Sequence, residues 1–184
     1  VNYRRETFSG KTRLHGMWDS DQDDDFGTER ENIAAPETRG WFQWRHKQYL
    51  PRDWTAQAEA SYICDRNFLE EFFPDEFWRE KPQETLLYAK KQRDNWALTI
   101  LGQWRINRFL TQTESLPDVA GYLIGLPLWD GRVNSFTEAR AGLVRLRPAY
   151  GDDTDVAPRA DLREEVNAPV ALGPVKVLPF VTGR

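Results

Sequence analysis

The sequence contains few of the side chains that build disulfides, metal sites or nucleophilic active sites. Cys64 is the single cysteine among 184 residues, so neither an internal disulfide nor a site of several thiolates can form. Histidine is almost as rare, with only His15 and His46. No histidine lies near Cys64 in the sequence, and no Gly-x-Ser-x-Gly elbow is present. We therefore expect no enzyme activity, no catalytic residues, no cofactor and no metal.

Long runs of one kind of residue are missing as well. Acidic and basic residues are mixed along the chain, the net charge is -4, and no basic block could follow a phosphate backbone, so nucleic acid is not an expected partner. No apolar run reaches the roughly 18 to 20 residues of a transmembrane helix. A membrane β-barrel stays possible, because barrel strands alternate between apolar and polar residues and are hydrophilic on average.

Aromatic residues are plentiful, with eight tryptophans and 13% aromatics in total. Such side chains serve soluble cores, sugar-binding faces and membrane interfaces alike. Alternation with a period of two is far more frequent than helical spacing, so we predict an all-β chain. The clearest example is 96–107, whose apolar face has Trp at both ends while the other face is largely polar. This pattern is typical of a barrel with lipid outside and water inside.

Segments 8–18, 40–47 and 54–64 repeat the pattern. The side chains that we expect to face a membrane are Trp44, Trp54, Tyr62, Trp96, Leu98, Ile100, Trp104 and Ile106. The candidate glycan contacts on the opposite, lumen-facing side are Lys11, Arg13, Arg45, Lys47, Arg105 and Arg140. Charged residues on an interior wall select what can pass or dock, particularly phosphorylated or acidic sugars. The alternative is plain solvation of a wet interior, and in a soluble sandwich the same face would be the solvent face.

The connections between the strands also form a pattern. We place about nine strands, near 7–18, 39–48, 54–64, 84–92, 96–107, 121–128, 133–146, 160–171 and 175–183. Long connectors (19–38, 65–83, 108–120, 147–159) alternate with short ones (49–53, 93–95, 129–132, 173–174). An outer-membrane meander has tight turns at one end and long loops at the other, whereas a Greek-key sandwich has no reason to keep this order. We predict an antiparallel up-and-down meander that is part of a large transmembrane β-barrel.

The ends of the sequence suggest one incomplete domain. The chain begins at Val1 without an initiator Met or a signal peptide, and it stops at Arg184 just after an apolar run. An odd number of strands would leave unpaired edges, which a membrane barrel cannot tolerate. We expect residues 1–184 to be a segment of one outer-membrane β-barrel domain that is incomplete at both ends.

Two acidic segments are candidate sites. Residues 19–27 (DSDQDDDFG) have the carboxylate density of a calcium loop but lack the Gly and Glu of the EF-hand pattern, so we interpret them as a solvated loop, with cation binding as the alternative. Residues 65–83 contain Asp65, Glu70, Glu71, Asp75 and Glu76. A glycosidase holds two carboxylates on opposite sides of a cleft, whereas these are close together in a connector. We interpret them as exposed loop residues.

If residues 67–73 of the same connector form a helical turn, four apolar side chains share one face. These are Phe68, Leu69, Phe72 and Phe73. We expect a loop that packs its own aromatic residues at a membrane rim.

The order of three segments resembles a known family. The segment 62–72 (YICDRNFLEEF) resembles the Tyr-x-Ser-Asp-x-x-Phe/Tyr-Leu-x-x-Phe signature in the barrel domain of the lipopolysaccharide-assembly LptD family, also called OstA or organic solvent tolerance protein. Residues 121–128 (GYLIGLPL) are similar to its tyrosine-and-proline strand entry, and 159–184 are similar to its Arg-x-Asp-Leu, Pro, Pro-Phe/Tyr-Val run. Cys64 stands where the signature usually has Ser, and Gly121-Tyr122 replaces the Pro-Tyr pair of the middle motif.

The resemblance implies an outer-membrane barrel that delivers lipopolysaccharide to the outer leaflet, without covalent chemistry or a cofactor. The lumen would guide the hydrophilic glycan while the acyl chains leave sideways into lipid. The implied partners are lipopolysaccharide, outer-membrane lipid, an LptE-like lipoprotein and the periplasmic proteins of the lipopolysaccharide bridge. Two alternatives remain, another outer-membrane porin or channel, and a soluble Trp-rich β-sandwich that binds carbohydrate. A sandwich would bury the apolar face of 96–107 against a second sheet, whereas a barrel would expose it.

Overall fold

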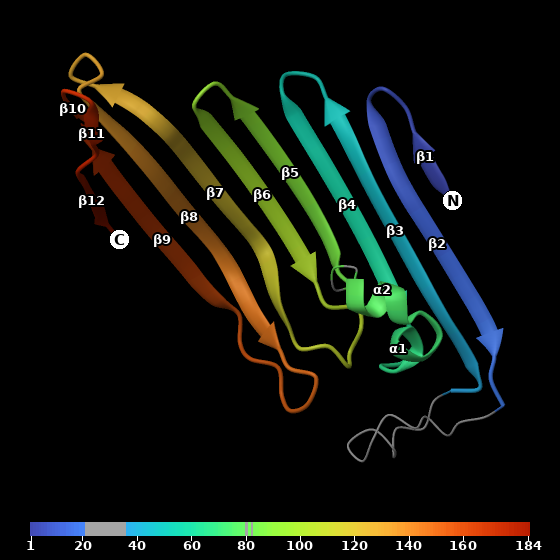
Figure 1. The fold of residues 1–184 in the computed structure, drawn as a ribbon. Coiled ribbons are helices and arrows are strands. Elements are labelled where there is room, and N and C mark those ends of the chain that lie inside the picture. Colours follow the sequence, from blue (N-terminus) through green and yellow to red (C-terminus); the bar gives the residue numbers. More distant parts are fainter. Residues whose placement is uncertain (21–35, 80, 82) are drawn as a thin grey trace.

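The computed structural model of the chain describes residues 1–20, 36–79, 81 and 83–184. Ten strands form one antiparallel sheet in the order β1-β2-β3-β4-β5-β6-β7-β8-β9-β12 (Figure 1). The strands of this sheet are β1 (Asn2–Arg4), β2 (Phe8–Trp18), β3 (Thr38–Leu50), β4 (Trp54–Ile63), β5 (Thr85–Arg93), β6 (Trp96–Trp104), β7 (Gln112–Leu128), β8 (Val133–Arg147), β9 (Ala157–Asn167) and β12 (Phe180–Gly183). The predicted all-β, up-and-down meander is confirmed, because each strand from β1 to β9 pairs with the next one in sequence.

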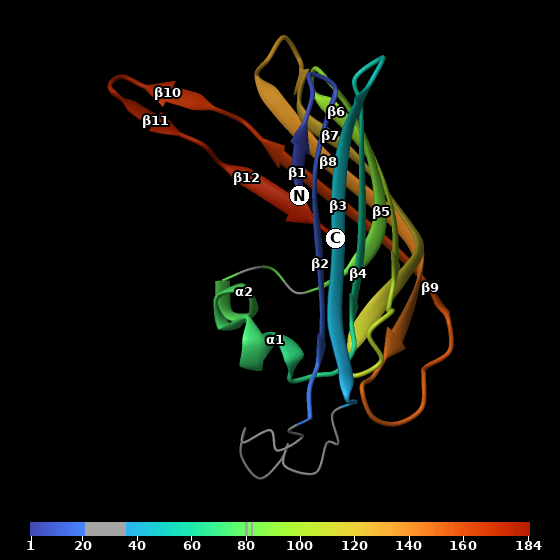
Figure 2. The same ribbon diagram turned by 90° about the vertical axis from the view of Figure 1, so that its right-hand side faces the viewer.

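The sheet is a single curved layer. Two short helices, α1 (Phe68–Phe72) and α2 (Pro74–Arg79), lie on its concave side (Figure 2). We call this side the inner face and the opposite side the outer face. In the described part of the chain no second sheet packs on the outer face, since the long strands form a single sheet and the two helices lie on its inner face. The sheet therefore leaves its outer face uncovered.

The chain reverses tightly at one end of the sheet and through longer connections at the other (Figure 1). The short turns 51–53, 94–95 and 129–132 lie at one end, which we call the short-turn end, and contain residues with positive φ such as Asp53, Asp94 and Asp130. Such backbone angles suit tight hairpins, since they match the twist of the flanking strands. Connections 64–84 and 148–156 lie at the opposite, long-loop end. No helix in the described residues is long and apolar enough to cross a membrane.

The structure corrects the predicted start of β7. This strand has 17 residues and begins at Gln112, so the predicted long connector 108–120 is wrong and the actual connection is 105–111. The pairing with β8 shifts register between Ser115 and Asp118. This bulge accommodates Pro117, which has no N–H to donate to the ladder. The irregularity interrupts the alternation, and the strand is therefore not recognisable from the sequence pattern before Gly121.

The last part of the chain differs from the prediction as well. The predicted strands 160–171 and 175–183 are each divided, since β10 (Val170–Leu172) pairs with β11 (Val175–Val177) as a separate hairpin while β12 returns to β9. Proline residues at 169 and 179 flank this hairpin, where they interrupt the ladder. The short strand β1, which pairs with β2 at the edge of the sheet, is outside the predicted strands.

Candidate functional site

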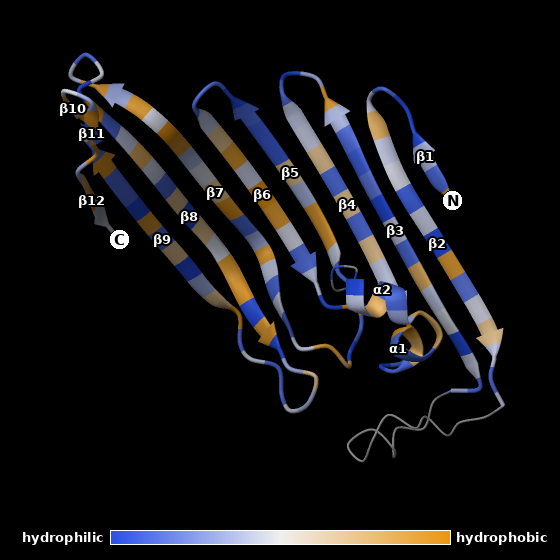
Figure 3. Ribbon diagram, in the orientation of Figure 1, coloured by the Kyte–Doolittle hydropathy of each residue, from blue (hydrophilic) through white to orange (hydrophobic). Residues whose placement is uncertain are grey.

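The outer face of the sheet is an exposed apolar band. Residues that pair directly across neighbouring strands share one face, and the register joins Phe42 to Tyr62 and Ile100 to Val119. The expected membrane-facing residues of β3, β4 and β6 all lie on this face, and Ile106 follows the end of β6 and is exposed. Further exposed apolar residues on it are Leu14, Trp18, Leu87, Val119, Leu123, Leu143 and Leu162. Figure 3 shows hydrophobic and hydrophilic residues alternating along these strands.

Three polar ring groups on this apolar face form hydrogen bonds with one another. Trp44 Nε1 donates to Tyr3 Oη over 3.0 Å, and Tyr3 Oη lies 2.9 Å from His46 Nδ1. The Tyr3 ring lies directly above Gly10, because a Cβ on Gly10 would be 2.1 Å from Tyr3 Oη. A glycine in β2 therefore makes room for an aromatic residue of β1 that covers two polar ring nitrogens, as an apolar environment requires.

Four of the expected lumen-facing cations come together on the inner face of β2 and β3. The register pairs Lys11 with Arg45 and Ser9 with Lys47, and Arg13 lies two positions further along β2. Lys11, Arg45 and Lys47 line a hollow of about 800 Å³ at the short-turn end, and Arg13 is outside its lining. The basic residues that line this hollow are Arg4, Arg5, Lys11, Arg45 and Lys47, and the acidic ones are Glu6 and Glu59. The excess of basic side chains makes the hollow suited to an anion.

Arg4 and Arg5 are functional candidates that the sequence pattern does not reveal. Arg4 pairs with Ser9, which pairs with Lys47, so its register places it on the inner face. The three residues of β1 are too few to show alternation. Only the pairing of β1 with β2 indicates which side Arg4 occupies.

The other two predicted cations lie elsewhere. Arg140 is on the inner face of β8, where its Nε donates to Asp118 Oδ1 over 2.8 Å. Arg105 follows the end of β6 at the long-loop end, and its Nη1 donates to the carbonyl oxygen of Pro148 over 2.6 Å. Arg105 and Arg140 therefore do not line the hollow.

The helical segment 65–79 is attached to the inner face by a buried arginine. Arg39 is 1% exposed, and its Nε and Nη2 each donate to a carboxylate oxygen of Asp65 over 3.0 Å. Its Nη1 lies 2.8 Å from Asp19 Oδ2 and 2.7 Å from Glu71 Oε2. Asp65 also accepts the backbone N–H groups of Asn67 and Phe68 at the start of α1. The interpretation of these carboxylates as exposed loop residues is wrong for the buried Asp65 and for Glu71, which is half-buried in α1 and pairs with Arg39, whereas Asp75 is exposed.

The ionisation of Asp65 and Cys64 follows from these contacts. Burial alone would raise the pKa of Asp65, but the hydrogen bonds from Arg39 and the Cys64 thiol and the charge of Arg39 lower that pKa below its usual value. Cys64 Sγ accepts the Gly40 N–H over 3.1 Å and donates to Asp65 over 2.9 Å. Burial and the adjacent carboxylate raise the pKa of Cys64 to about 11. The thiol is neutral at ordinary pH and is not an activated nucleophile.

An aromatic cluster holds the same segment against β3 and β4. Its buried members are Trp41, Ile63, Phe68 and Leu69, with Phe72, Phe73 and Phe77 packed around them. The segment thus packs its own aromatic residues, as expected, but on the inner face of the sheet. The Gln83 side-chain oxygen accepts from Gln43 (2.8 Å) and Ser61 (2.6 Å), and Lys81 Nζ lies 2.7 Å from Glu59.

The acidic segment 19–27 is the other candidate site, with cation binding as its alternative interpretation. Asp19 pairs with Arg39, while the rest of the acidic segment 19–27 from residue 21 onward lies outside the described residues. In the described part of the chain, no group of three or more histidine, cysteine or acidic residues could hold a metal ion. The sequence matches no family model and no curated protein.

Proposed function

We propose that the chain is a segment of an outer-membrane β-barrel of the lipopolysaccharide-assembly (LptD-like) type, which delivers lipopolysaccharide to the outer leaflet. The observation that carries this proposal is the opposite character of the two faces of a one-layer meander, which is apolar outside and polar inside, with a basic hollow at the short-turn end. Contiguous exposed apolar surface of this extent is rare on soluble monomers and indicates contact with lipid or with another protein. The three resembling segments favour the assembly family among barrels of this kind.

In the proposed mechanism the inner face becomes the barrel lumen and no bond is made or broken. Lys11, Arg45 and Lys47 attract the phosphorylated part of the glycan, because cations on an interior wall stabilise phosphate groups. The apolar acyl chains move sideways into the membrane. Under this proposal an LptE-like lipoprotein and the periplasmic bridge proteins are partners, and the protein resides in the cell outer membrane.

The two alternatives fit less well or differ in a measurable way. A soluble sandwich needs the outer face of β6 to be covered, but Ile100 and Trp104 are 38% and 37% exposed. A porin or channel fits the two faces equally, and the basic hollow would then favour anions. Ion conductance of the purified full-length protein in planar bilayers distinguishes a channel, which conducts steadily, from an assembly protein, which does not.

The test uses the full-length protein in cells that depend on it. Replacing Lys11, Arg45 and Lys47 by Gln should lower surface lipopolysaccharide severalfold while the amount of folded barrel stays the same. The matched control replaces Lys90, Arg159 and Arg163 by Gln, because these cations also have inner-face register but lie on β5 and β9. Unchanged surface lipopolysaccharide in the first variant would overturn the proposed role of the hollow.

A further inference from the structure

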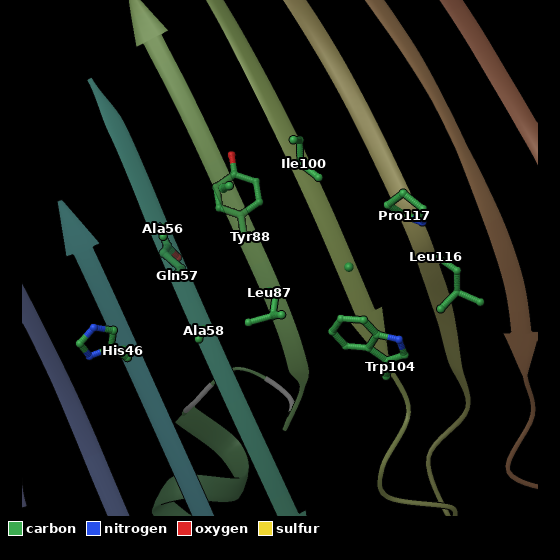
Figure 4. Close-up of a pocket in the computed structure, with 12 residues that line it drawn as sticks. His46, Ala56, Gln57, Ala58, Leu87, Tyr88, Ile100, Trp104, Leu116 and Pro117 are labelled. Atoms are coloured by element: carbon green, nitrogen blue, oxygen red, sulfur yellow. The ribbon is translucent and has the colours of Figure 1, made fainter. Parts of the chain in front are cut away.

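The outer face has a shallow apolar groove of about 560 Å³ that crosses β4, β5 and β6 (Figure 4). Its floor is made of small residues on these strands, namely Ala56, Ala58, Ala89 and Gly102, and Ala56 pairs directly with Ala89. Bulkier side chains border it, among them Leu87, Trp104 and Pro117. The groove is thus a depression within the exposed apolar band.

The shape of the groove is built into the sheet. Trp104 lies over Gly102, where an added Cβ would be 2.8 Å from the end of the indole ring. On the neighbouring strand β7, the register shift between Ser115 and Asp118 brings Leu116 and Pro117 to the border of the groove. A large aromatic ring and a bulge therefore raise the border while alanine keeps the floor low.

A cation marks the end of the groove nearest the short turns. Lys91 follows Ala89 on the same face of β5, about 7 Å further along the strand, because side chains alternate at about 3.4 Å per residue. Its Nζ lies 5.7 Å from the centre of the Trp54 ring and 5.6 Å from that of Trp96. A lysine between two tryptophans is a favourable cation-π arrangement, and both residue types collect where a membrane meets water.

We propose that this groove holds one acyl chain of an anionic phospholipid from the leaflet at the short-turn end, with the lipid phosphate beside Lys91. This inference rests on the proposed membrane position of the sheet. From Lys91 to Leu87 the strand spans about 14 Å, close to half of a hydrocarbon core of about 30 Å. The charge of Lys91 complements a phosphate, and the apolar groove complements a hydrocarbon chain.

A lipid fits this groove better than a polypeptide. A peptide laid across it would bring backbone N–H and C=O groups onto a floor of alanine and glycine, and an unpaired polar group on an apolar surface is costly. A hydrocarbon chain has no such groups. Because the groove is on a sheet face, it also presents no strand edge with which a peptide could pair.

The experiment measures lipid retention by native mass spectrometry of the full-length protein reconstituted with phosphatidylglycerol or phosphatidylcholine of identical chains. The wild type should retain phosphatidylglycerol preferentially. Lys91→Gln should reduce that preference about five-fold, the factor expected for one lysine near an anionic surface. Lys90→Gln is the matched control, because it removes a charge from the adjacent inner-face position and should leave the preference unchanged. Ala89→Phe fills the groove and should reduce retention of both lipids.

The possible failures have separate meanings. If Lys91→Gln keeps the full preference, or Ala89→Phe retains lipid like the wild type, the groove proposal is wrong while the barrel proposal stands. If the wild-type protein does not partition into membranes at all, both proposals fail. Surface lipopolysaccharide should be unchanged in Lys91→Gln, which separates this site from the basic hollow.

Discussion

Arg39 and Asp65 form a bidentate ion pair, with Nε to Oδ2 and Nη2 to Oδ1 both 3.0 Å, although the two residues are 26 positions apart in the sequence. Arg39 belongs to β3, and Asp65 lies just before α1. The pair therefore fixes the direction in which the chain leaves β4. It turns the helical segment 65–79 over the inner face, where that segment covers Trp41.

Breaking this pair should release the helical segment. We expect Arg39→Met to destabilise the attachment by about 3 to 5 kcal/mol, because it leaves the buried Asp65 carboxylate unpaired. Limited proteolysis of the full-length protein should then cut within 65–79 while the strands stay protected. Arg79→Gln is the control, since its ion pair with Asp75 is exposed and such pairs contribute less than about 1 kcal/mol. Equal protease resistance in both variants would contradict the role of Arg39.

The attachment should also weaken in acid. Because the folded-state pKa of Asp65 is lowered from the usual 3.8, its ion pair stabilises the fold fully above that value and stops doing so as the pH falls below it. Cleavage within 65–79 by an acid-active protease should rise below about pH 3.8 in the wild type. In Asp65→Asn, cleavage should be high already at neutral pH and change less with acid. If the wild type is as resistant to cleavage in acid as it is at neutral pH, the ionised Asp65 does not hold the segment in place.

Cys64 should behave as a hydrogen-bonding group and not as a reactive thiol. Cys64→Ser should keep stability within about 1 kcal/mol, since a hydroxyl can accept from Gly40 and donate to Asp65, whereas Cys64→Val loses both bonds and about 1 to 3 kcal/mol. Thermal unfolding of the full-length variants measures this difference. Alkylation of the folded wild type should accelerate only as the pH approaches about 11. Rapid labelling at pH 8 would contradict a neutral thiol.

Two glycines on the outer face of β2 should respond differently to the same substitution. Gly10→Ala should cost about 1 to 3 kcal/mol, because its Cβ would meet Tyr3 Oη at 2.1 Å and the Arg45 carbonyl oxygen at 2.5 Å. Gly16→Ala is the matched control, since nothing lies within 4 Å of its added Cβ. Unfolding of the full-length variants by heat in detergent gives the comparison. Equal stability would mean that Tyr3 does not lie over β2.

Charged substitutions in β6 test the proposal that the outer face of the sheet contacts lipid. Ile100→Lys should destabilise the membrane-inserted protein by about 2 to 4 kcal/mol if this position lies near the bilayer centre. Thr99→Lys, on the adjacent inner-face position, should be tolerated because it adds to a polar wall. Equilibrium unfolding from lipid vesicles measures both variants. The reverse order of stabilities would mean that the inner face, not the outer one, contacts lipid.

Much of the strand architecture can be predicted from the sequence. Alternation of apolar and polar residues in β6 determines which side chains share a face, because neighbouring residues of a strand point to opposite sides. The turn at 129–132 could be recognised since Asp and Gly suit tight reversals. The apolar spacing at 67–73 is compatible with the helical turn that the structure shows at Phe68–Phe72. These features depend on local backbone geometry, which a short window of residues contains.

Features that depend on residues distant in sequence could not be predicted and are seen only in the tertiary structure. Pairing with β8 extends β7 through Pro117, and pairing with β2 places Arg4 on the same inner face as Lys47. The charge of Asp65 suggested a solvated loop, and only its pairing with Arg39 showed a buried attachment site. The meander and its two faces can thus be predicted from the periodicity of apolar and polar residues. Tertiary contacts determine the direction of the helical segment, the residues that line the basic hollow and the groove near Lys91. Pairing across strands brings these side chains together, although they are far apart in the sequence.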